Sequence, residues 1–174
     1  AAAAVILPEG FFCEGLDDSK KLSAAKRDRL FEFLTTHAGL RWSVALVHAD
    51  QIDSINILRA THLAMEMAVR QLDQEIGHCL IDGLRLPRFP WPHDGIVKGD
   101  GLSLSIAAAS IVAKVTRDRW MLERSREFPQ YGFERHQGYG TKAHLEALRI
   151  HGPCRIHRRS FQPVAQLSLP FGEA

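Results

Sequence analysis

Short apolar segments alternate with helical segments along this chain, and this order constrains the fold more than any other feature. Four segments are short and apolar and predict strands: residues 1–7, 42–47, 78–81 and 95–98. Helical spacing of apolar side chains predicts helices over residues 23–36, 103–128 and 141–150, and a long helix that starts at Asp53 or Ser54. Strands that alternate with helices indicate an α/β fold.

The charge of the chain is distributed unevenly. Its 174 residues are 45% hydrophobic, enough for one domain with a buried core. Residues 1–97 carry 10 Lys or Arg against 13 Asp or Glu, whereas residues 98–174 carry 12 against 7. A basic second half favours a polyanionic partner such as nucleic acid, although a solvated basic face fits the charge equally well.

The cysteines and the apolar runs bear on localisation. Cys13, Cys79 and Cys154 are widely spaced without a Cys-x-x-Cys pair, which argues against a disulfide framework or a zinc knuckle and favours a reducing compartment. No apolar run is long enough to cross a membrane, and the first residues lack the features of a signal peptide. We expect a cytoplasmic monomer without a membrane partner.

Two aspartates follow two of the predicted strands. Asp82 and Asp100 each come after an apolar segment and adjoin a glycine. Functional groups of open α/β sheets gather at the carboxyl ends of strands, so neighbouring strands would bring these carboxylates together. Such a pair needs a cation or a raised pKa, and its hard oxygen ligands favour Mg²⁺ or Mn²⁺. The alternative is that each aspartate only caps a turn.

Seven segments occur in the order found in bacterial ribonuclease HII, which the chain resembles over residues 1–164. The segments are GLDDSKKLS (15–23), NILRATHLAM (56–65), LIDG (80–83), VKGD (97–100), SIAAASIVAKVTRDRWM (105–121), YGFERHQGYGTKAHLEAL (131–148) and HGPCRIHRRSF (151–161). The resemblance implies an α/β, ribonuclease H-like mixed sheet flanked by helices, with a helical C-terminal extension. Residues 165–174 are expected to form a flexible tail.

The resemblance also implies an activity. Family members are endonucleases that hydrolyse the RNA strand of RNA–DNA hybrids and cut 5′ to single ribonucleotides embedded in duplex DNA. They use two divalent cations, Mg²⁺ or Mn²⁺, held by four carboxylates. Asp82 and Asp100 match two of those four and are the candidate catalytic and metal-binding residues. The alternative is a catalytically inactive fragment, or a nucleic-acid-binding module of the same fold.

The other two family carboxylates have no match in residues 1–174. They are the adjacent Asp and Glu of an Asp-Glu-x-Gly-Arg-Gly segment on the first, central strand of the family sheet, and residues 1–7 correspond to the second strand. We therefore expect this chain to be a piece of a longer gene product. Without the two missing carboxylates, two-metal catalysis by residues 1–174 alone is in doubt. A degenerate, inactive descendant is the less favoured explanation.

Four further residues are candidates for substrate binding. In the family, the tyrosine matching Tyr139 packs on the sugar beside the scissile junction, whereas a tyrosine packed on its own loop is the alternative. Ser19, Lys20 and Lys21 fill a Ser-Lys-Lys motif, and paired ammonium groups on a loop suit phosphate contacts. Two solvated lysines are the alternative.

Other polar residues receive structural interpretations. Asp118 is expected to be a salt-bridge partner remote from the metals. For Arg158 and Arg159, beside His157, contact with a nucleic-acid backbone and pairing with acidic groups of the domain are nearly balanced. The histidines of the second half lack a metal-ligand spacing.

The C-terminal segment carries a separate signal. Residues 166–171, QLSLPF, resemble the short peptide with which bacterial replication and repair proteins dock on the sliding clamp. Leu169 and Phe171 would enter an apolar pocket, with Leu167 beside them, while Gln166 bonds at its rim. A tail that packs on its own domain or remains disordered is the alternative.

Overall fold

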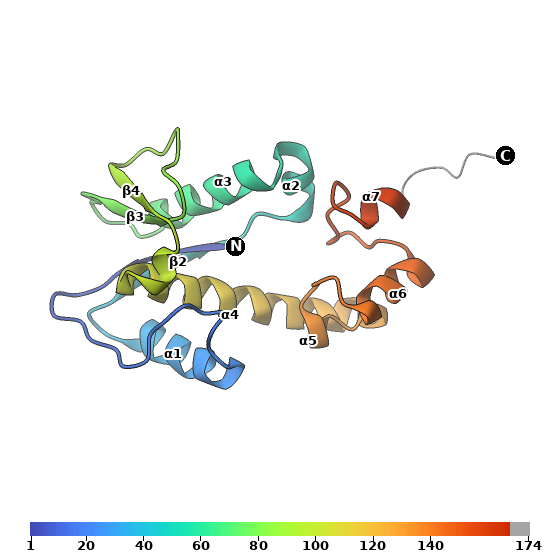
Figure 1. The fold of residues 1–174 in the computed structure, drawn as a ribbon, viewed down its shortest axis with the longest axis horizontal. Coiled ribbons are helices and arrows are strands. Elements are labelled where there is room, and N and C mark those ends of the chain that lie inside the picture. Colours follow the sequence, from blue (N-terminus) through green and yellow to red (C-terminus); the bar gives the residue numbers. More distant parts are fainter. Residues whose placement is uncertain (168–174) are drawn as a thin grey trace. The chain divides into compact units, whose positions relative to one another are not determined.

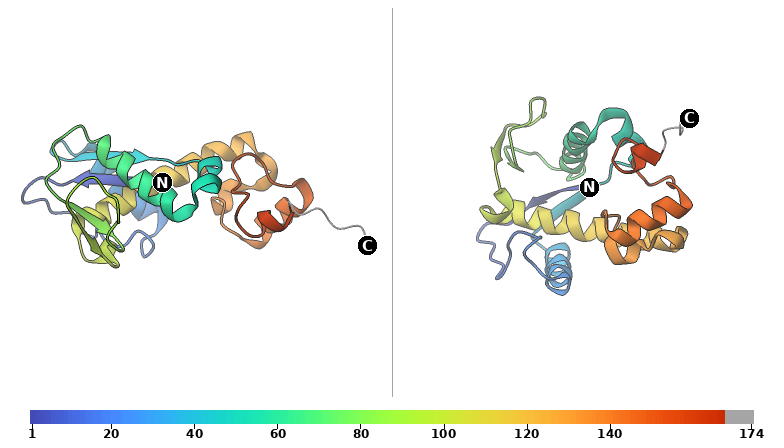
Figure 2. Two further views of the ribbon diagram at one scale, coloured as in Figure 1. Left: turned by 90° about the horizontal axis from the view of Figure 1, so that it is seen from above. Right: turned by 45° about the vertical axis from the view of Figure 1, so that its right-hand side comes forward.

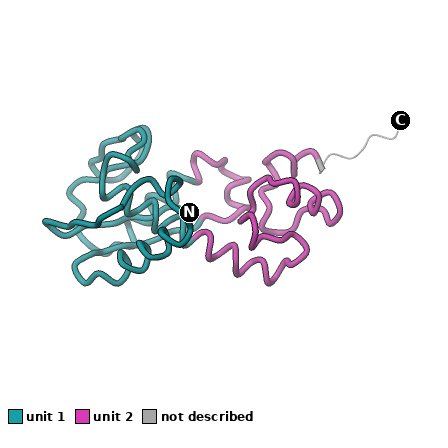
Figure 3. The backbone as a smooth tube through the Cα atoms, turned by 60° about the horizontal axis from the view of Figure 1, so that its bottom comes forward, with its two compact units in different colours: residues 1–46, 61–116 teal, residues 47–60, 117–174 magenta. Residues whose placement is uncertain are grey.

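The computed structural model describes residues 1–167. The chain divides into two compact units (Figure 3). Unit 1 comprises residues 1–46 and 61–116, and unit 2 comprises residues 47–60 and the chain from residue 117 onward. Unit 1 contains both carboxylates predicted to bind metal, and unit 2 contains Tyr139.

Unit 1 is built around a pair of antiparallel strands, β1 (Ala2–Ile6) and β2 (Arg41–Ala45). Along the chain, helix α1 (Ala24–Thr36) connects these two strands. The hydroxyl of Ser23 caps this helix by accepting a hydrogen bond from the Lys26 amide at 3.3 Å. The strand predicted over residues 1–7 and the helix predicted over residues 23–36 are both confirmed.

Helices lie on either side of this strand pair. Residues of α1 pack with the first half of α4 (Leu104–Glu127) on one face, and α3 (Ile57–Arg70) lies on the other (Figures 1 and 2). Small side chains of α4 permit this close packing, as predicted, since Ala108 is completely buried together with Ile111 and Val112. On the α3 side, the Ser43 hydroxyl donates to the Ala68 carbonyl.

A second pair of strands carries the candidate site. β3 (Cys79–Asp82) and β4 (His93–Ile96) are parallel, with Asp82 opposite Ile96. The chain then forms the short 3₁₀ helix η1 (Gly99–Gly101). Within residues 1–167, the β1–β2 and β3–β4 pairs share no backbone pairing and remain two separate sheets, so they form only parts of the mixed sheet that the resemblance implies.

The long helix is predicted to begin at Asp53 or Ser54, and this predicted first residue is wrong. Two helices, α2 (Ala49–Ile55) and α3, are separated by Asn56, whose φ of 67° is incompatible with a continuous helix. Its side-chain oxygen accepts a hydrogen bond from the Arg59 amide at 3.1 Å and so caps the new helix. Leu58 of α3 is 63% exposed, whereas its buried positions include Ala60, Ala64 and Ala68.

Unit 2 contains α2, the second half of α4 and the short helices that follow it. These short helices are η2 (Pro129–Tyr131), α5 (Phe133–His136), α6 (Lys142–His151) and α7 (Val164–Leu167). The helix predicted over residues 141–150 is confirmed by α6. Six residues form the core of this unit: Met121, Tyr131, Phe133, Ala147, Leu148 and Val164. Within residues 1–167, every helix is too short or too polar to span a bilayer.

Candidate active site at the carboxyl ends of two parallel strands

The two predicted metal ligands lie at one edge of the β3–β4 pair. Asp82 is the last residue of β3, and its carboxylate accepts a hydrogen bond from the amide of Gly99 at 3.0 Å. Gly99 immediately precedes Asp100, which lies in η1 and is 6% exposed. The Gly83 amide donates to the Ile96 carbonyl at 2.9 Å and extends the pairing beyond Asp82. The first carboxylate therefore bonds to the turn that carries the second.

Local sequence explains this turn. Lys98 adopts a left-handed conformation, with φ 58° and ψ 37°, and so reverses the chain after β4. At Gly99, a Cβ atom would lie 2.5 Å from the Cδ1 atom of Ile106 and 3.3 Å from the Cβ atom of Ile96. A larger residue at position 99 would have to displace the Ile106 side chain, so glycine lets the turn lie close to α4 and β4. The Lys-Gly-Asp sequence therefore fixes where the Asp100 carboxylate lies.

The Ser-Lys-Lys loop reaches the same site. The Lys20 ammonium lies 3.4 Å from a carboxylate oxygen of Asp100, 80 positions away in the chain. This hydrogen bond and the charge of Asp100 raise the pKa of Lys20, with smaller contributions from Asp18 and Asp82. A mobile cation, 78% exposed, thus lies within electrostatic reach of both carboxylates.

The other two residues of the motif have different surroundings. The buried Ser19 hydroxyl hydrogen-bonds with that of Ser110 at 2.8 Å, so its side chain anchors the loop to α4. Lys21 is exposed and lies 3.1 Å from Asp17. Of the three predicted phosphate-binding side chains, only the two lysines therefore face solvent.

The described part of the chain does not complete a metal centre. Asp82 and Asp100 supply the hard oxygen atoms that Mg²⁺ and Mn²⁺ prefer. Among residues 1–167, however, no three His, Cys, Asp or Glu side chains are positioned to hold an ion together. The donor set fits part of a divalent-cation site and requires further ligands.

Tyr139 lies in unit 2, on the loop between α5 and α6. Its side chain is largely exposed, and the Arg117 guanidinium lies 5.2 Å from the centre of the ring. Arg117 also donates to the Gln137 carbonyl at 2.9 Å and so supports the same loop. The Tyr139 ring is therefore largely exposed to solvent but contacts the Arg117 guanidinium.

Three histidines that the motif search did not assign surround this loop. His136, His144 and His157 are all buried, and the rings of His136 and His144 stack with their centres 4.5 Å apart. The Nε2 atoms of His144 and His157 lie 3.1 Å apart. In the sequence, His136 and His144 flank the glycine-rich loop on either side of Tyr139, which is the available signal that they support this loop. Metal-ligand spacing alone does not reveal this arrangement.

The buried histidines predict acid sensitivity. Burial and the neighbouring His144 lower the pKa of His157 from 6.5 to about 4, and burial likewise lowers the pKa of His144. Between pH 6.5 and 4 the unfolded chain takes up a proton at His157 that the folded chain does not. The contribution of the neutral His157 to the unfolding free energy is therefore complete above pH 6.5 and is lost as the pH falls through 4. We expect His157 to account for a fall of about 2 kcal/mol in the unfolding free energy between pH 7 and 5.

Urea unfolding at the two pH values measures this fall. The groups around position 157 are the same in the parent protein and in a His157→Gln variant: His136, His144, Cys154 and Tyr131. The difference between the two proteins in how the unfolding free energy changes with pH therefore isolates His157. Equal slopes would contradict the assignment.

The remaining polar residues have structural partners. The Oδ1 atom of Asp118 lies 3.5 Å from Nη1 of Arg117, and this ion pair fits the interpretation of Asp118 as a salt-bridge residue. The Asp53 carboxylate accepts hydrogen bonds from the amides of Arg159 at 2.7 Å and Ser160 at 2.9 Å. The Arg158 guanidinium lies 3.7 Å from the ring centre of Phe161, and burial lowers its pKa. This segment is therefore tied to its own unit through Asp53.

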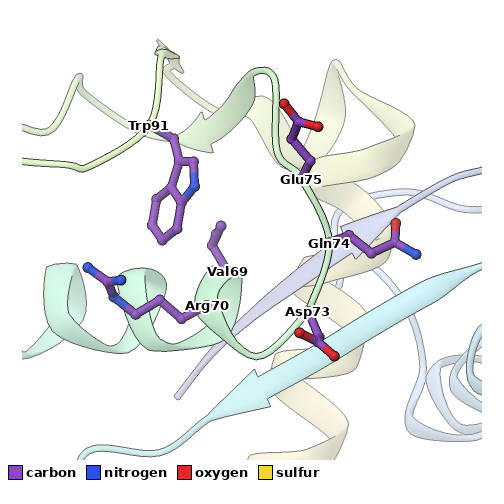
Figure 4. Close-up of a pocket in the computed structure, with 6 residues that line it drawn as sticks. All are labelled: Val69, Arg70, Asp73, Gln74, Glu75 and Trp91. Carbon is purple, nitrogen blue, oxygen red and sulfur yellow. The ribbon is translucent and has the colours of Figure 1, made fainter.

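Unit 1 also contains a pocket that neither Asp82 nor Asp100 lines (Figure 4). Its lining residues are Val69, Arg70, Asp73, Gln74, Glu75 and Trp91. They precede β3 and β4, whereas Asp82 and Asp100 follow the carboxyl ends of these strands. Arg70 lies 5.4 Å from the centre of the Trp91 ring and is paired with Glu66, so the cation of this pocket already has partners.

The predicted clamp-binding segment is only partly described. Gln166 and the backbone of Leu167 belong to α7, which begins at the buried Val164. Leu169 and Phe171 lie outside the described residues.

Comparisons with known proteins show which family the chain belongs to. The family model of ribonuclease HII matches residues 1–164. The ribonuclease HII of Burkholderia pseudomallei strain 668 is 54% identical over 165 residues, which cover 95% of this chain and 77% of that protein. The ribonuclease HII of Bacillus cereus strain G9842 is 51% identical over 165 residues, and the match covers 95% of this chain but 63% of that protein. The chain thus spans less than two thirds of the length of the Bacillus relative.

A solved structure has the same fold. The ribonuclease H2 of Pyrococcus horikoshii OT3 superposes with a TM-score of 0.70 at 22% identity, covering 88% of this chain and 80% of that one. The observed arrangement is thus an α/β, ribonuclease H-like fold. From the family match and the sequence identity, we conclude that this chain belongs to the ribonuclease HII family.

Proposed function

We propose that the protein containing this chain is an endonuclease that hydrolyses the RNA strand of RNA–DNA hybrids and cuts 5′ to single ribonucleotides in duplex DNA. The family match supports the substrate class. The observation that carries the proposal is the hydrogen bond from the Gly99 amide to the Asp82 carboxylate, because it holds one carboxylate against the turn that carries the other. Residues 1–164 would act as one functional domain, in the cytoplasm and as a monomer.

Asp82 and Asp100 are the residues that would hold two divalent cations, Mg²⁺ or Mn²⁺. When bound, such ions supply a nucleophilic water and stabilise the leaving oxygen of a phosphodiester. Asp100, buried and fixed by its turn, is suited to hold a constant position, whereas the exposed Asp82 faces solvent at the strand end. The Lys20 ammonium balances the charge of Asp100 when no other cation does so.

The remaining metal ligands would come from a strand that carries the Asp-Glu-x-Gly-Arg-Gly segment of the family. Two observations support this part of the proposal. The β1–β2 and β3–β4 pairs share no backbone pairing, and the match covers 63% of the Bacillus relative. A strand between the two pairs would join them into the mixed sheet that the family resemblance implies.

Substrate contacts are proposed for two regions. Lys20 and Lys21 would contact phosphate groups, with Ser19 anchoring their loop, because both ammonium groups are exposed. The exposed ring of Tyr139 would pack on the sugar beside the scissile junction, with Arg117 behind it. Residues 166–171, through Gln166, Leu167, Leu169 and Phe171, are proposed to dock on the bacterial sliding clamp.

A nucleic-acid-binding module without catalysis is the second candidate, favoured by the incomplete ligand set of residues 1–167. Cleavage of a labelled duplex with one ribonucleotide separates the two. With Mn²⁺ present, the full-length protein is expected to cut 5′ to the ribonucleotide, leaving a 3′-hydroxyl and a 5′-phosphate. Tight binding of that duplex without cleavage would reject the endonuclease and support the binding module.

A further inference from the structure

A chain of hydrogen bonds runs through the buried histidines of unit 2 and ends on the backbone of Tyr139. The Cys154 amide donates to Nδ1 of His157 at 3.0 Å. The Nε2 atom of His157 lies 3.1 Å from that of His144, and Nδ1 of His144 lies 2.9 Å from the Tyr139 carbonyl oxygen. The two imidazoles thus connect the segment around Cys154 to the loop that carries Tyr139.

The partners at the two ends fix every proton in this chain. A neutral imidazole has one donor and one acceptor nitrogen. Because a backbone amide donates to Nδ1 of His157, the proton of this ring is on Nε2. Because a carbonyl oxygen only accepts, the proton of His144 is on Nδ1. His157 Nε2–H therefore donates to His144 Nε2, and the two independently assigned tautomers match at the bond they share.

The third histidine holds the other side of the loop. The Gly138 amide donates to Nδ1 of His136 at 3.2 Å, so its Nε2–H donates to the Tyr131 carbonyl at 2.9 Å. The Tyr139 amide in turn donates to the His136 carbonyl at 2.8 Å. The Tyr139 backbone is thus bonded on both its amide and its carbonyl side.

We infer that His144 is a positioning residue for Tyr139, acting through the hydrogen bond from its Nδ1–H to the Tyr139 carbonyl. The inference rests on the proposed function, in which Tyr139 contacts the sugar at the cleavage site. The loop needs such a support because Gly138, with a φ of 81°, and Gly140 flank the tyrosine. Each glycine adds backbone freedom that a fixed carbonyl removes. An aromatic ring that reads one sugar must be held to within a fraction of an ångström.

Two substitutions of His144 separate the tether from general packing. Asn places an amide N–H near the position of Nδ1 and keeps the donor to Tyr139. Gln places its amide near the position of Nε2 and keeps only the partner of His157. We expect His144→Gln to lower cleavage at a single ribonucleotide by about 10- to 100-fold in the full-length protein, and His144→Asn to remain within about threefold of the parent.

The matched control is His93→Gln. His93 is buried to the same degree in unit 1, and both of its ring nitrogens are also hydrogen-bonded, here to the Leu86 amide and the Trp91 carbonyl. His93 belongs to unit 1 and the Tyr139 loop to unit 2, so this variant measures the cost of losing any buried histidine. We expect His93→Gln to leave the ratio of cleavage at a single ribonucleotide to cleavage of a continuous hybrid unchanged, and His144→Gln to lower it.

A double-mutant cycle with Tyr139→Ala completes the test. If the tether acts through Tyr139, His144→Gln has no further effect in a Tyr139→Ala background. Equal activity of His144→Asn and His144→Gln, or the same loss in both tyrosine backgrounds, would overturn the inference.

Amide exchange distinguishes failure of the inference from failure of the proposed function. The Thr141 amide donates to the Tyr139 carbonyl at 2.8 Å, and its exchange reports directly on this carbonyl. We expect exchange to be faster in His144→Gln than in His144→Asn, whether or not the protein cuts a ribonucleotide. Equal exchange in the two variants would overturn the inference by itself, whereas an inactive parent protein would reject only the proposed function.

Discussion

Replacing Asp100 by Asn in the full-length protein is expected to lower metal-dependent cleavage of a ribonucleotide-containing duplex by about 10³-fold or more. Asn keeps the size of the side chain and an oxygen for Lys20 but removes the negative charge that attracts a divalent cation. Bound metals stabilise transition-state charge by several kcal/mol, and about 4 kcal/mol corresponds to about 10³-fold in rate. Initial rates with Mn²⁺ and with Mg²⁺ measure the loss.

The fold should tolerate this change. The ion pair of Asp100 with the largely exposed Lys20 is worth less than about 1 kcal/mol of stability, so the thermal transition should shift little. Asp94→Asn is the matched control, because Asp94 lies in β4 at the other end from the turn and contacts His78. We expect it to cut within about twofold of the parent. Near-parental cleavage by Asp100→Asn would remove Asp100 from the metal site.

Replacing Phe133 by Ala is expected to cost about 3–5 kcal/mol of unfolding free energy. Its side chain is 1% exposed and stacks on Tyr131, with ring centres 5.3 Å apart. The same ring lies 5.5 Å from His144 and 5.6 Å from His157, so its loss leaves a cavity beside both histidines. A loss of this size is a large part of the roughly 5–15 kcal/mol by which domains are stable.

Denaturant unfolding of the parent protein and the variant measures this cost. Phe12→Ala serves as the control, because Phe12 is 78% exposed and its removal should change stability by less than about 0.5 kcal/mol. A cost below about 1 kcal/mol for Phe133→Ala would mean that this ring does not organise the core of unit 2.

Local patterns predict much of unit 1. Ser23 before an amphipathic run predicts α1 and its cap, and the short apolar segment that ends at Asp-Gly predicts β3. These features depend on residues close in the chain, where spacing and turn chemistry decide the conformation. The strand predicted over residues 95–98 is placed two residues too late, because β4 is His93–Ile96 and Lys98 already belongs to the turn. The break at Asn56 was missed because the helical spacing of apolar residues continues across it.

Long-range pairings are not accessible in this way. The contact of Lys20 with Asp100 joins residues 80 positions apart, and the histidine chain joins three segments around the buried Phe133. Side-chain spacing cannot reveal that Nδ1 of His144 meets the Tyr139 carbonyl, because this depends on how α5 and α6 pack. The same holds for Ser19, whose burial against Ser110 follows from the position of α4.

The central claim is that Asp82 and Asp100 jointly hold the catalytic metal ions. A crystal structure of the full-length protein with Mn²⁺, with the ions located by anomalous scattering, tests it most directly. The prediction is that two ions lie side by side at the carboxyl ends of β3 and β4, each in direct contact with at least one of these carboxylates, and that the Lys20 ammonium no longer contacts Asp100. Ions bound elsewhere, with both aspartates uncoordinated and Lys20 still paired, would contradict it.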